Sequence, residues 1–262
     1  MRLDLTVVNY ILPSQSDELL IQSLDSYGEL FWRNVDSHLV FKKDPSATLV
    51  EHLNKLGIKY SIAPDSLWMP TFLNLVQESK TKYILLFIED ICIMDPDKLV
   101  HTFQTLEGNN ADCTPTIGLR MWHKVVDHIK NKKVQDIDSD DKFHLTYWGT
   151  RQSAYYQQPS IKETVGSHII PYPISAPGIF KKDFLIHTAE VMMQSDYWKA
   201  IEVDPDCFTN QDWAKNPRLP HSYEVFWHHN KHLLDLEYTI LIPKENNSYS
   251  NDPKDLHRDT DY

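Results

Sequence analysis

The sequence predicts an α/β protein with a mostly parallel sheet that is flanked by helices. Residues 83–88 form an unbroken apolar run, which is typical of a strand buried on both faces in a parallel sheet. Over the first 120 residues, short apolar runs alternate with segments whose leucines repeat at helical spacing. This alternation indicates right-handed crossover connections between parallel strands.

The elements of this first half begin and end at recognisable residues. Ser16, followed by two acidic residues, opens a helix, and Gly57 follows the last apolar position of another helix, as a residue just beyond a helix does. Asp95 before Pro96 predicts a further helix start beyond the apolar run. The expected strands cover residues 3–11, 37–42, 59–63 and 83–88, and the expected helices between them cover residues 16–32, 46–56 and 70–79.

The pattern changes in the second half. Residues 131–142 are polar and acidic and are expected to form a loop, whereas residues 116–122 predict a strand and residues 180–193 predict a helix. Residues 147–172 are aromatic and polar, which suits either a binding wall or ordinary loop packing. Residues 245–262 are almost free of aliphatic side chains and predict a polar tail, either mobile or ordered over a ligand.

Composition and charge disfavour several classes of protein. The formal charge of −11 over 262 residues opposes non-specific binding to nucleic acid or to anionic membranes. No apolar run approaches the roughly 20 residues that a membrane-spanning helix needs, and the N-terminus reads as a strand rather than a signal peptide. Cys92, Cys113 and Cys207 lack metal-site spacing and indicate a reducing compartment. We therefore expect a cytoplasmic protein with no transmembrane segment and no nucleic-acid partner.

Two adjacent carboxylates, Glu89 and Asp90, end the long apolar run. Ligands of open α/β sheets bind at the carboxyl ends of the strands. Acidic side chains at such an edge can hold a divalent metal and, through the metal, a diphosphate. The alternative interpretation is a solvated turn before a helix.

The order of strands and helices, together with residues 83–91 and the segment Met94-Asp-Pro-Asp-Lys-Leu99, resembles the nucleotide-sugar glycosyltransferases of the A-type (GT-A) fold, in particular their family-2-like group. The resemblance implies a Rossmann-like sheet and a nucleoside diphosphate sugar donor. It also implies a glycan or other hydroxyl acceptor and a divalent metal, Mn²⁺ or Mg²⁺. The first 120 residues would form the nucleotide-sugar-binding half of one domain spanning residues 1–244, and residues 121–244 the acceptor-binding half, with residues 245–262 as the tail.

The acidic motif of the family is incomplete in this chain. The family's strand ends in a D-x-D motif, whose first and second carboxylates would fall on Ile88 and Asp90. A related E-D-D variant would use Glu89 and Asp90 and would find Ile91 at its last position. The resemblance therefore implies Asp90, and then Glu89, as the residues that face the diphosphate or metal, and it leaves metal dependence open.

The resemblance also assigns two residues to the nucleoside side of the donor site. Asp44 follows the second strand, where the family has an acidic residue that contacts the base or ribose. The alternative role for Asp44 is to cap the helix after it. Tyr10, at the end of the first strand, could stack on the base. Asn74 is a weaker counterpart of a family asparagine.

Sugar transfer with inversion needs a carboxylate that takes the proton from the attacking hydroxyl. In the family this base begins a late helix, and Glu224 in the segment His221-Ser-Tyr-Glu-Val-Phe-Trp227 stands at a suitable distance, with Ser222 as a possible cap. Asp212 is the second candidate. The alternative role for Glu224 is a favourable interaction with the helix dipole.

Two basic pairs also lie in the second half. His228 and His232 share one helical face at the spacing of a two-histidine metal site, and His228 could complete a metal shell with Asp90; ordinary hydrogen-bonded helix histidines are the alternative. Lys181 and Lys182 could neutralise phosphate or could form an exposed basic pair.

These observations favour a hexosyl- or pentosyltransferase involved in carbohydrate biosynthesis, with inversion as the expected outcome. A nucleotidyltransferase that makes nucleotide sugars is disfavoured because residues 10–18 contain no glycine for a phosphate-binding loop. A non-catalytic sugar- or nucleotide-binding domain that kept the fold is the alternative of a different class, and the incomplete acidic motif favours it somewhat.

Overall fold

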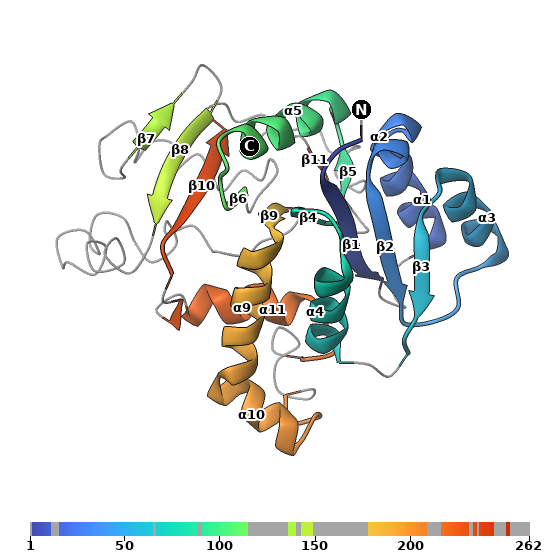
Figure 1. The fold of residues 1–262 in the computed structure, drawn as a ribbon. Helices are drawn as coiled ribbons and strands as arrows, with labels where there is room; N and C mark the ends of the chain where they lie inside the picture. The colour runs from blue at the N-terminus through green and yellow to red at the C-terminus, as the bar shows by residue number, and fades with distance from the viewer. Residues whose placement is uncertain are drawn as a thin grey trace, which may run out of the picture.

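The protein is an α/β structure in which helices cover both faces of a twisted sheet (Figure 1). It is described from a computed structural model. The described residues are 2–11, 16–64, 67–87, 91–114, 136–139, 143–148, 178–208, 216–230, 233–234, 236–243 and 250–251.

The first half of the sheet is parallel and has the strand order β3-β2-β1-β4. Leu5 and Val8 of β1 lie opposite Tyr83 and Leu86 of β4, and Ile11 at the end of β1 lies opposite Phe41 at the end of β2. Its strands are β1 (Leu5–Ile11), β2 (Asp36–Phe41), β3 (Lys59–Ile62) and β4 (Tyr83–Leu86). All four expected strands are confirmed, with ends that differ by one or two residues from the sequence prediction.

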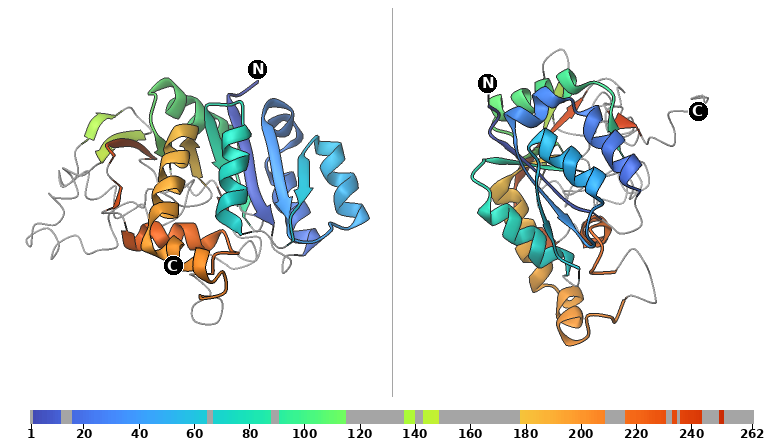
Figure 2. Two further views of the ribbon diagram at one scale, coloured as in Figure 1. Left: turned by 60° about the horizontal axis from the view of Figure 1, so that its bottom comes forward. Right: turned by 90° about the vertical axis from the view of Figure 1, so that its right-hand side faces the viewer.

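The helices between these strands lie on opposite faces of the sheet, as right-handed crossovers require. From β1 the chain moves outward through β2 to β3 with its helices on one face, and then returns through α4 on the other face to reach β4. The right-hand view of Figure 2 shows α1 and α3 on one side of the strands and α4 and α9 on the other. The helices are α1 (Asp17–Ser26), α2 (Glu29–Asn34), α3 (Ala47–Leu56), α4 (Trp68–Glu78) and α5 (Pro96–Gly108).

Local sequence signals explain where these helices begin and end. The side chains of Ser16, Ser46 and Asp95 accept hydrogen bonds from the backbone three residues later and cap α1, α3 and α5, and Gly57 ends α3 at φ 73°. The single helix expected over residues 16–32 is instead two helices. Gly28 separates them with φ 80° and ψ 147°, a conformation that is nearly exclusive to glycine.

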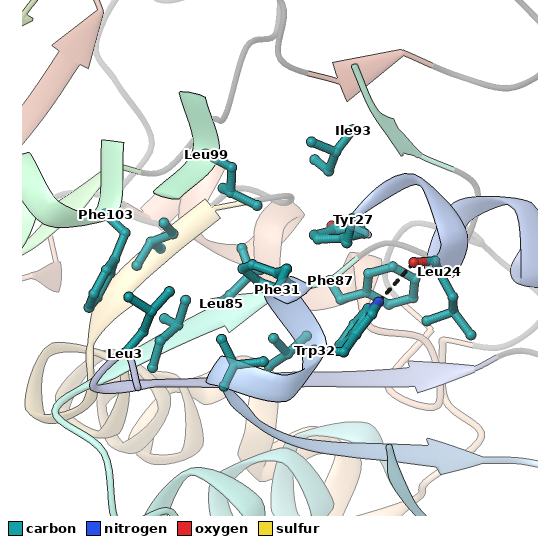
Figure 3. Close-up of a cluster of buried hydrophobic side chains, with 14 of the residues drawn as sticks. Leu3, Leu24, Tyr27, Phe31, Trp32, Leu85, Phe87, Ile93, Leu99 and Phe103 are labelled. Atoms are coloured by element: carbon teal, nitrogen blue, oxygen red, sulfur yellow. Dashed lines mark hydrogen bonds between the residues drawn. The ribbon is translucent and has the colours of Figure 1, made fainter. Parts of the chain in front are cut away.

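Each face of the sheet has its own apolar core. On the α1 face, β-strand residues such as Val7 and Leu85 pack with α1, α2, α3 and α5. Figure 3 shows part of this core, where the Trp32 indole donates a hydrogen bond to the Leu24 carbonyl at 2.8 Å. On the α4 face, Val8 and Ile84 pack with α4 and with later helices. Alternate strand residues thus serve opposite cores.

The second half continues the same sheet with mostly antiparallel pairings. Beyond β4 the order is β9-β6-β10-β8-β7, in which only the β6–β10 pair is parallel. The expected α/β class is confirmed, and the sheet as a whole is mixed. These strands are β6 (Cys113–Thr114), β7 (Asp136–Ser139), β8 (Phe143–Trp148), β9 (Gly178–Lys181) and β10 (Tyr238–Pro243).

Two sequence predictions for this half need correction. The loop expected over residues 131–142 contains β7, an edge strand that carries Asp136 and Asp138, and charged residues are common on exposed sheet edges. The helix expected over residues 180–193 is preceded by β9, which takes the first two of those residues. The strand expected over residues 116–122 lies outside the described residues, as does the aromatic segment beyond Trp148. The helices here are α9 (Lys182–Gln194), α10 (Asp196–Val203) and α11 (His221–Asn230).

A separate two-stranded ribbon joins the segment after β4 to the last part of the chain. It pairs β5 (Cys92–Ile93), which follows β4 closely, with β11 (Ser250–Asn251), which belongs to the expected polar tail. The tail therefore contains a strand that is paired to the segment after the acidic residues.

Candidate functional site

The reversal of the strand order between β1 and β4 defines a candidate binding site. The connection after β1 leads to β2, which pairs with one edge of β1, whereas β4 pairs with the opposite edge of β1. In open α/β sheets, ligands bind at such a point, outside the carboxyl ends of the two strands. Figure 1 shows the arrowheads of β1, β2 and β3 at the same end of the sheet.

Backbone hydrogen bonds draw the strand ends together at this edge. The Lys42 amide, just after β2, donates to the Ile11 carbonyl at 3.2 Å. The Ala63 amide, just after β3, donates to the Phe41 carbonyl at 2.8 Å. The Phe87 amide, just after β4, donates to the Val8 carbonyl at 3.0 Å. The segments that leave β1, β2 and β4 therefore start from fixed neighbouring positions.

Asp44 lies at this edge and has no role as a helix cap. Its side chain is exposed, three residues beyond the end of β2. The cap of α3 is Ser46, whose Oγ accepts a hydrogen bond from the Leu49 amide at 3.2 Å. The capping role considered for Asp44 is thus wrong, and its carboxylate remains a candidate for ligand binding.

Glu89 and Asp90 lie outside the described residues, but both ends of their segment are anchored. On one side, the Phe87 amide donates a hydrogen bond to the Val8 carbonyl of β1. On the other, the Ile91 carbonyl accepts a 2.6 Å hydrogen bond from Ser23 of α1. Only residues 88–90 separate these two anchors in the sequence. Their assignment to a diphosphate or metal stays a prediction.

The helix that carries Glu224 docks at the same edge of the sheet. The Trp68 amide at the start of α4 donates to the Pro217 carbonyl at 3.0 Å, just before α11. The Tyr223 ring lies 5.6 Å from the rings of both Trp68 and Phe72, measured between centroids. Because α4 follows β3, its first turn stands at the carboxyl edge, so the first turn of α11 stands there too (Figure 1).

Glu224 lies in the first turn of α11, as the sequence predicts, and is half-buried. Its neighbour Tyr223 is buried, and burial raises the pKa of the Tyr223 hydroxyl, so this group stays neutral. Ser222 is the second residue of the helix, and its Oγ donates to the Leu219 carbonyl at 2.8 Å. The expectation that Ser222 caps the helix is therefore wrong.

Lys181 and Lys182 lie at the opposite edge of the sheet. In the antiparallel pairing of β9 with β4, Lys181 stands opposite Tyr83 at the amino end of β4. Its Nζ forms a 2.7 Å ion pair with Asp112. The Lys182 Nζ donates to the carbonyls of Gln77 and Ser79 at the end of α4, where a cation interacts favourably with the helix dipole. Neither the phosphate role nor an exposed basic pair describes these lysines.

Several predicted site residues are placed only in part. The backbone of Tyr10 lies opposite Val40 near the carboxyl edge, and the backbone of His228 lies in α11. Asp212 and His232 lie outside the described residues. Asn74 is exposed on α4, and its amide donates to Glu78 at 3.2 Å, so it is engaged within its own helix.

The residues that position α11 were missed by sequence reasoning. Tyr223, Phe226 and Trp227 are buried at helical spacing, and this periodicity was the available signal. The contact of the Pro217 carbonyl with α4 has no local signal, because it joins backbone groups far apart in the sequence. Within the described part of the chain, no group of three or more His, Cys, Asp or Glu residues could hold a metal ion. No helix found there is long and apolar enough to cross a membrane.

The comparisons with known proteins find similar structures but no matching sequence family or curated protein. No family model matches the chain, and no curated protein matches it. Similar solved structures include a mannosyltransferase from Pyrobaculum calidifontis in complex with GDP-Man and Mn²⁺, at 12% identity and a TM-score of 0.42 over 70% of this chain and 46% of that one. This chain thus spans less than half of that enzyme.

Two other solved structures are also similar. One is a CMP:2-keto-3-deoxy-manno-octonic acid synthetase complexed with CTP, at 10% identity and a TM-score of 0.38 over 80% of this chain and 86% of that one. The other is core-mannan synthase A from Aspergillus fumigatus in an Mn/GDP form, at 12% identity and a TM-score of 0.32 over 88% of this chain and 70% of that one. The mannosyltransferase, whose complex contains GDP-Man, is of the class that the sequence resembles, whereas the synthetase is an enzyme that uses CTP.

Proposed function

We propose that the chain is a glycosyltransferase, which moves a sugar from a nucleoside diphosphate sugar to a hydroxyl group of a glycan or another acceptor. The observation that supports this most is that the residues on both sides of the acidic pair are anchored: Phe87 to β1, next to the reversal of the strand order, and Ile91 to α1. Asp44 stands at the same edge and is free of a capping role. Carboxylates at such an edge suit a metal-bound diphosphate and a ribose.

Each donor-site residue then has a distinct role. Asp44 and Tyr10 contact the nucleoside, and Glu89 and Asp90 face the diphosphate. A divalent cation, Mn²⁺ or Mg²⁺, held by Asp90 and His228 would supply positive charge beside the leaving group. Residues 1–120 bind the donor and residues 121–244 the acceptor, within one domain that the tail follows.

Glu224 is the proposed general base, with Asp212 as the second candidate. The carboxylate takes the proton of the acceptor hydroxyl while that oxygen attacks the anomeric carbon from the face opposite the nucleotide. The bond from the anomeric carbon to the diphosphate breaks, and the nucleoside diphosphate leaves with the bonding electrons. This displacement inverts the anomeric configuration. The docking of α11 against the start of α4 supports the assignment, because it brings the first turn of α11 to the edge where the donor would bind.

Donor binding is tested by the thermal stability of the full chain with nucleoside diphosphates and their sugars, each with and without Mn²⁺. A ligand that binds only the folded state raises the melting temperature. We expect a clear rise with one diphosphate sugar, which Asp90→Ala removes. The absence of a rise with any donor at millimolar concentration would refute the proposal.

The catalytic role of Glu224 gives a separate prediction. Glu224→Gln keeps the size of the side chain and removes its basicity, so we expect turnover to fall by about 10²- to 10⁴-fold with unchanged donor affinity. The matched control is Asp183→Asn, which removes a first-turn carboxylate from α9 and should leave turnover unchanged. Full activity in Glu224→Gln would exclude it as the base. Donor binding without turnover in the unaltered protein would favour the non-catalytic binding domain.

A further inference from the structure

The short strand β5 is held against α1 by side chains from the last two turns of that helix. Ser23, which is fully buried, donates from Oγ to the Ile91 carbonyl at 2.6 Å, and the Ser26 Oγ accepts from the Ile93 amide at 2.8 Å. The Ile93 side chain is buried beside Tyr27 in the core on the α1 face (Figure 3). One side of β5 is thus fixed by α1.

The other partner of β5 comes from the end of the chain. Ser250 and Asn251 of β11 pair antiparallel with Ile93 and Cys92. A two-stranded ribbon is marginally stable by itself in water. Its formation here depends on β5 already being held by α1, and in return β11 adds backbone pairing to β5.

This pairing lies close in sequence to the proposed donor site. Only Ile91 separates Asp90 from Cys92, and a chain spans at most about 3.6 Å per residue. The pairing of β11 therefore fixes the chain two residues beyond Asp90. Less conformational freedom in the free protein means less entropy lost when a ligand is bound.

We propose that β11 is a positioning element of the donor site: by pairing with β5, it holds the segment that follows Asp90 and strengthens binding of a metal-bound nucleoside diphosphate. The ligand in this statement rests on the proposed function. The restraint itself rests only on the pairing of β11 with β5. Whether the C-terminal segment is paired with β5 thereby changes the affinity of the donor site for the nucleoside diphosphate.

Two truncations separate β11 from the residues around it. Ending the chain after Lys244 removes β11 and leaves β10 whole, whereas ending it after Asn251 keeps β11 and removes only residues 252–262. The probes are UDP and GDP, each with Mn²⁺, measured by calorimetry, and hydrogen exchange of the amides of residues 87–93. We expect the shorter chain alone to exchange faster at these amides and to bind the diphosphate about 5-fold or more weakly, the lower end of ordinary coupling between sites.

Ser26→Ala provides a second route to the same result, because it removes the hydroxyl that holds Ile93 from the side of α1. It should speed exchange at the same amides while those of β2 and β3 stay protected. Unchanged exchange in the chain that ends at Lys244 would overturn the inference, as would an equal change in both truncations. If the full chain bound neither diphosphate, the proposed function would fail for these ligands, and the exchange result would still decide the restraint.

Discussion

Asp44 is a candidate ligand-binding residue with no role in capping the helix that follows it. It is exposed at the carboxyl edge, and the cap of the following helix is supplied by Ser46 two residues later. A carboxylate that stabilises nothing locally can be replaced at little cost in folding, so its substitution reports on ligand binding alone.

We expect Asp44→Ala to change the free energy of unfolding by less than about 0.5 kcal/mol, as surface substitutions usually do. Donor affinity should fall by about 1.5–3 kcal/mol, the range for hydrogen bonds to charged groups. Ser46→Ala is the control, since loss of the cap should cost about 1 kcal/mol of stability without weakening the donor. Chemical denaturation and calorimetry measure both quantities. An unaltered donor affinity in Asp44→Ala would remove this residue from the site.

At this scale the sequence predicts the features that depend on near neighbours. Ser16, Asp95 and Gly57 act three or four residues away, and their roles as helix ends are confirmed. The role of Lys181 could not be predicted, because its partner Asp112 is brought close only by the pairing of β9 with β6.

Among the elements, the break between α1 and α2 depends on one residue. Gly28 has φ 80°, and an added Cβ would meet no atom within 4 Å, so only the backbone conformation disfavours a side chain there. Gly108, within α5, has equally open surroundings and lacks a positive φ.

This contrast predicts opposite effects for two chemically identical substitutions. Gly28→Ala should destabilise the fold by about 1–3 kcal/mol, the usual cost of a residue held in a disfavoured region. Gly108→Ala should be neutral or stabilising by up to about 1 kcal/mol, because alanine favours helix. Urea unfolding measures both changes. Equal effects would mean that the helices do not need the break at Gly28.

Elements were predictable where their partners follow soon in the chain. The parallel strands β1 to β4 carry apolar runs, and each is separated from the next by a helix that the same pattern reveals. The strand β10 was missed although residues 238–242 form a short run of aromatic and β-branched residues that is typical of a strand. Its place beside β6 and β8 has no local signal, because these strands lie about a hundred residues away. The same limit applies to the candidate site: the carboxyl edge of the parallel strands was predictable, and the docking of α11 on α4 was not.

On the scale of the whole molecule, β4 joins the two halves of the sheet. It pairs with β1 on one side and with β9 on the other, and Ile84 is fully buried between Thr6 and Phe180 in this arrangement. A loss of packing at Ile84 therefore destabilises both halves of the sheet.

We expect Ile84→Ala to lower the free energy of unfolding by about 2–5 kcal/mol, the range for a buried isoleucine cut to alanine. The transitions followed by tryptophan fluorescence and by far-ultraviolet circular dichroism should shift together, because the sheet is shared. Ile62→Ala, at an exposed position on the edge strand β3, is the control and should have a small effect. Two transitions that shift by different amounts would show that the halves unfold separately.

The place of β9 in the sheet also has a consequence for the growing chain. Until residues 178–181 have been synthesised, the edge of β4 has no partner, although β1 to β4 have long left the ribosome. An unpaired edge beside apolar faces is prone to join another chain. Translation that stalls before β9 should therefore release fragments that aggregate, and factors that shield nascent chains should matter most over this interval of synthesis.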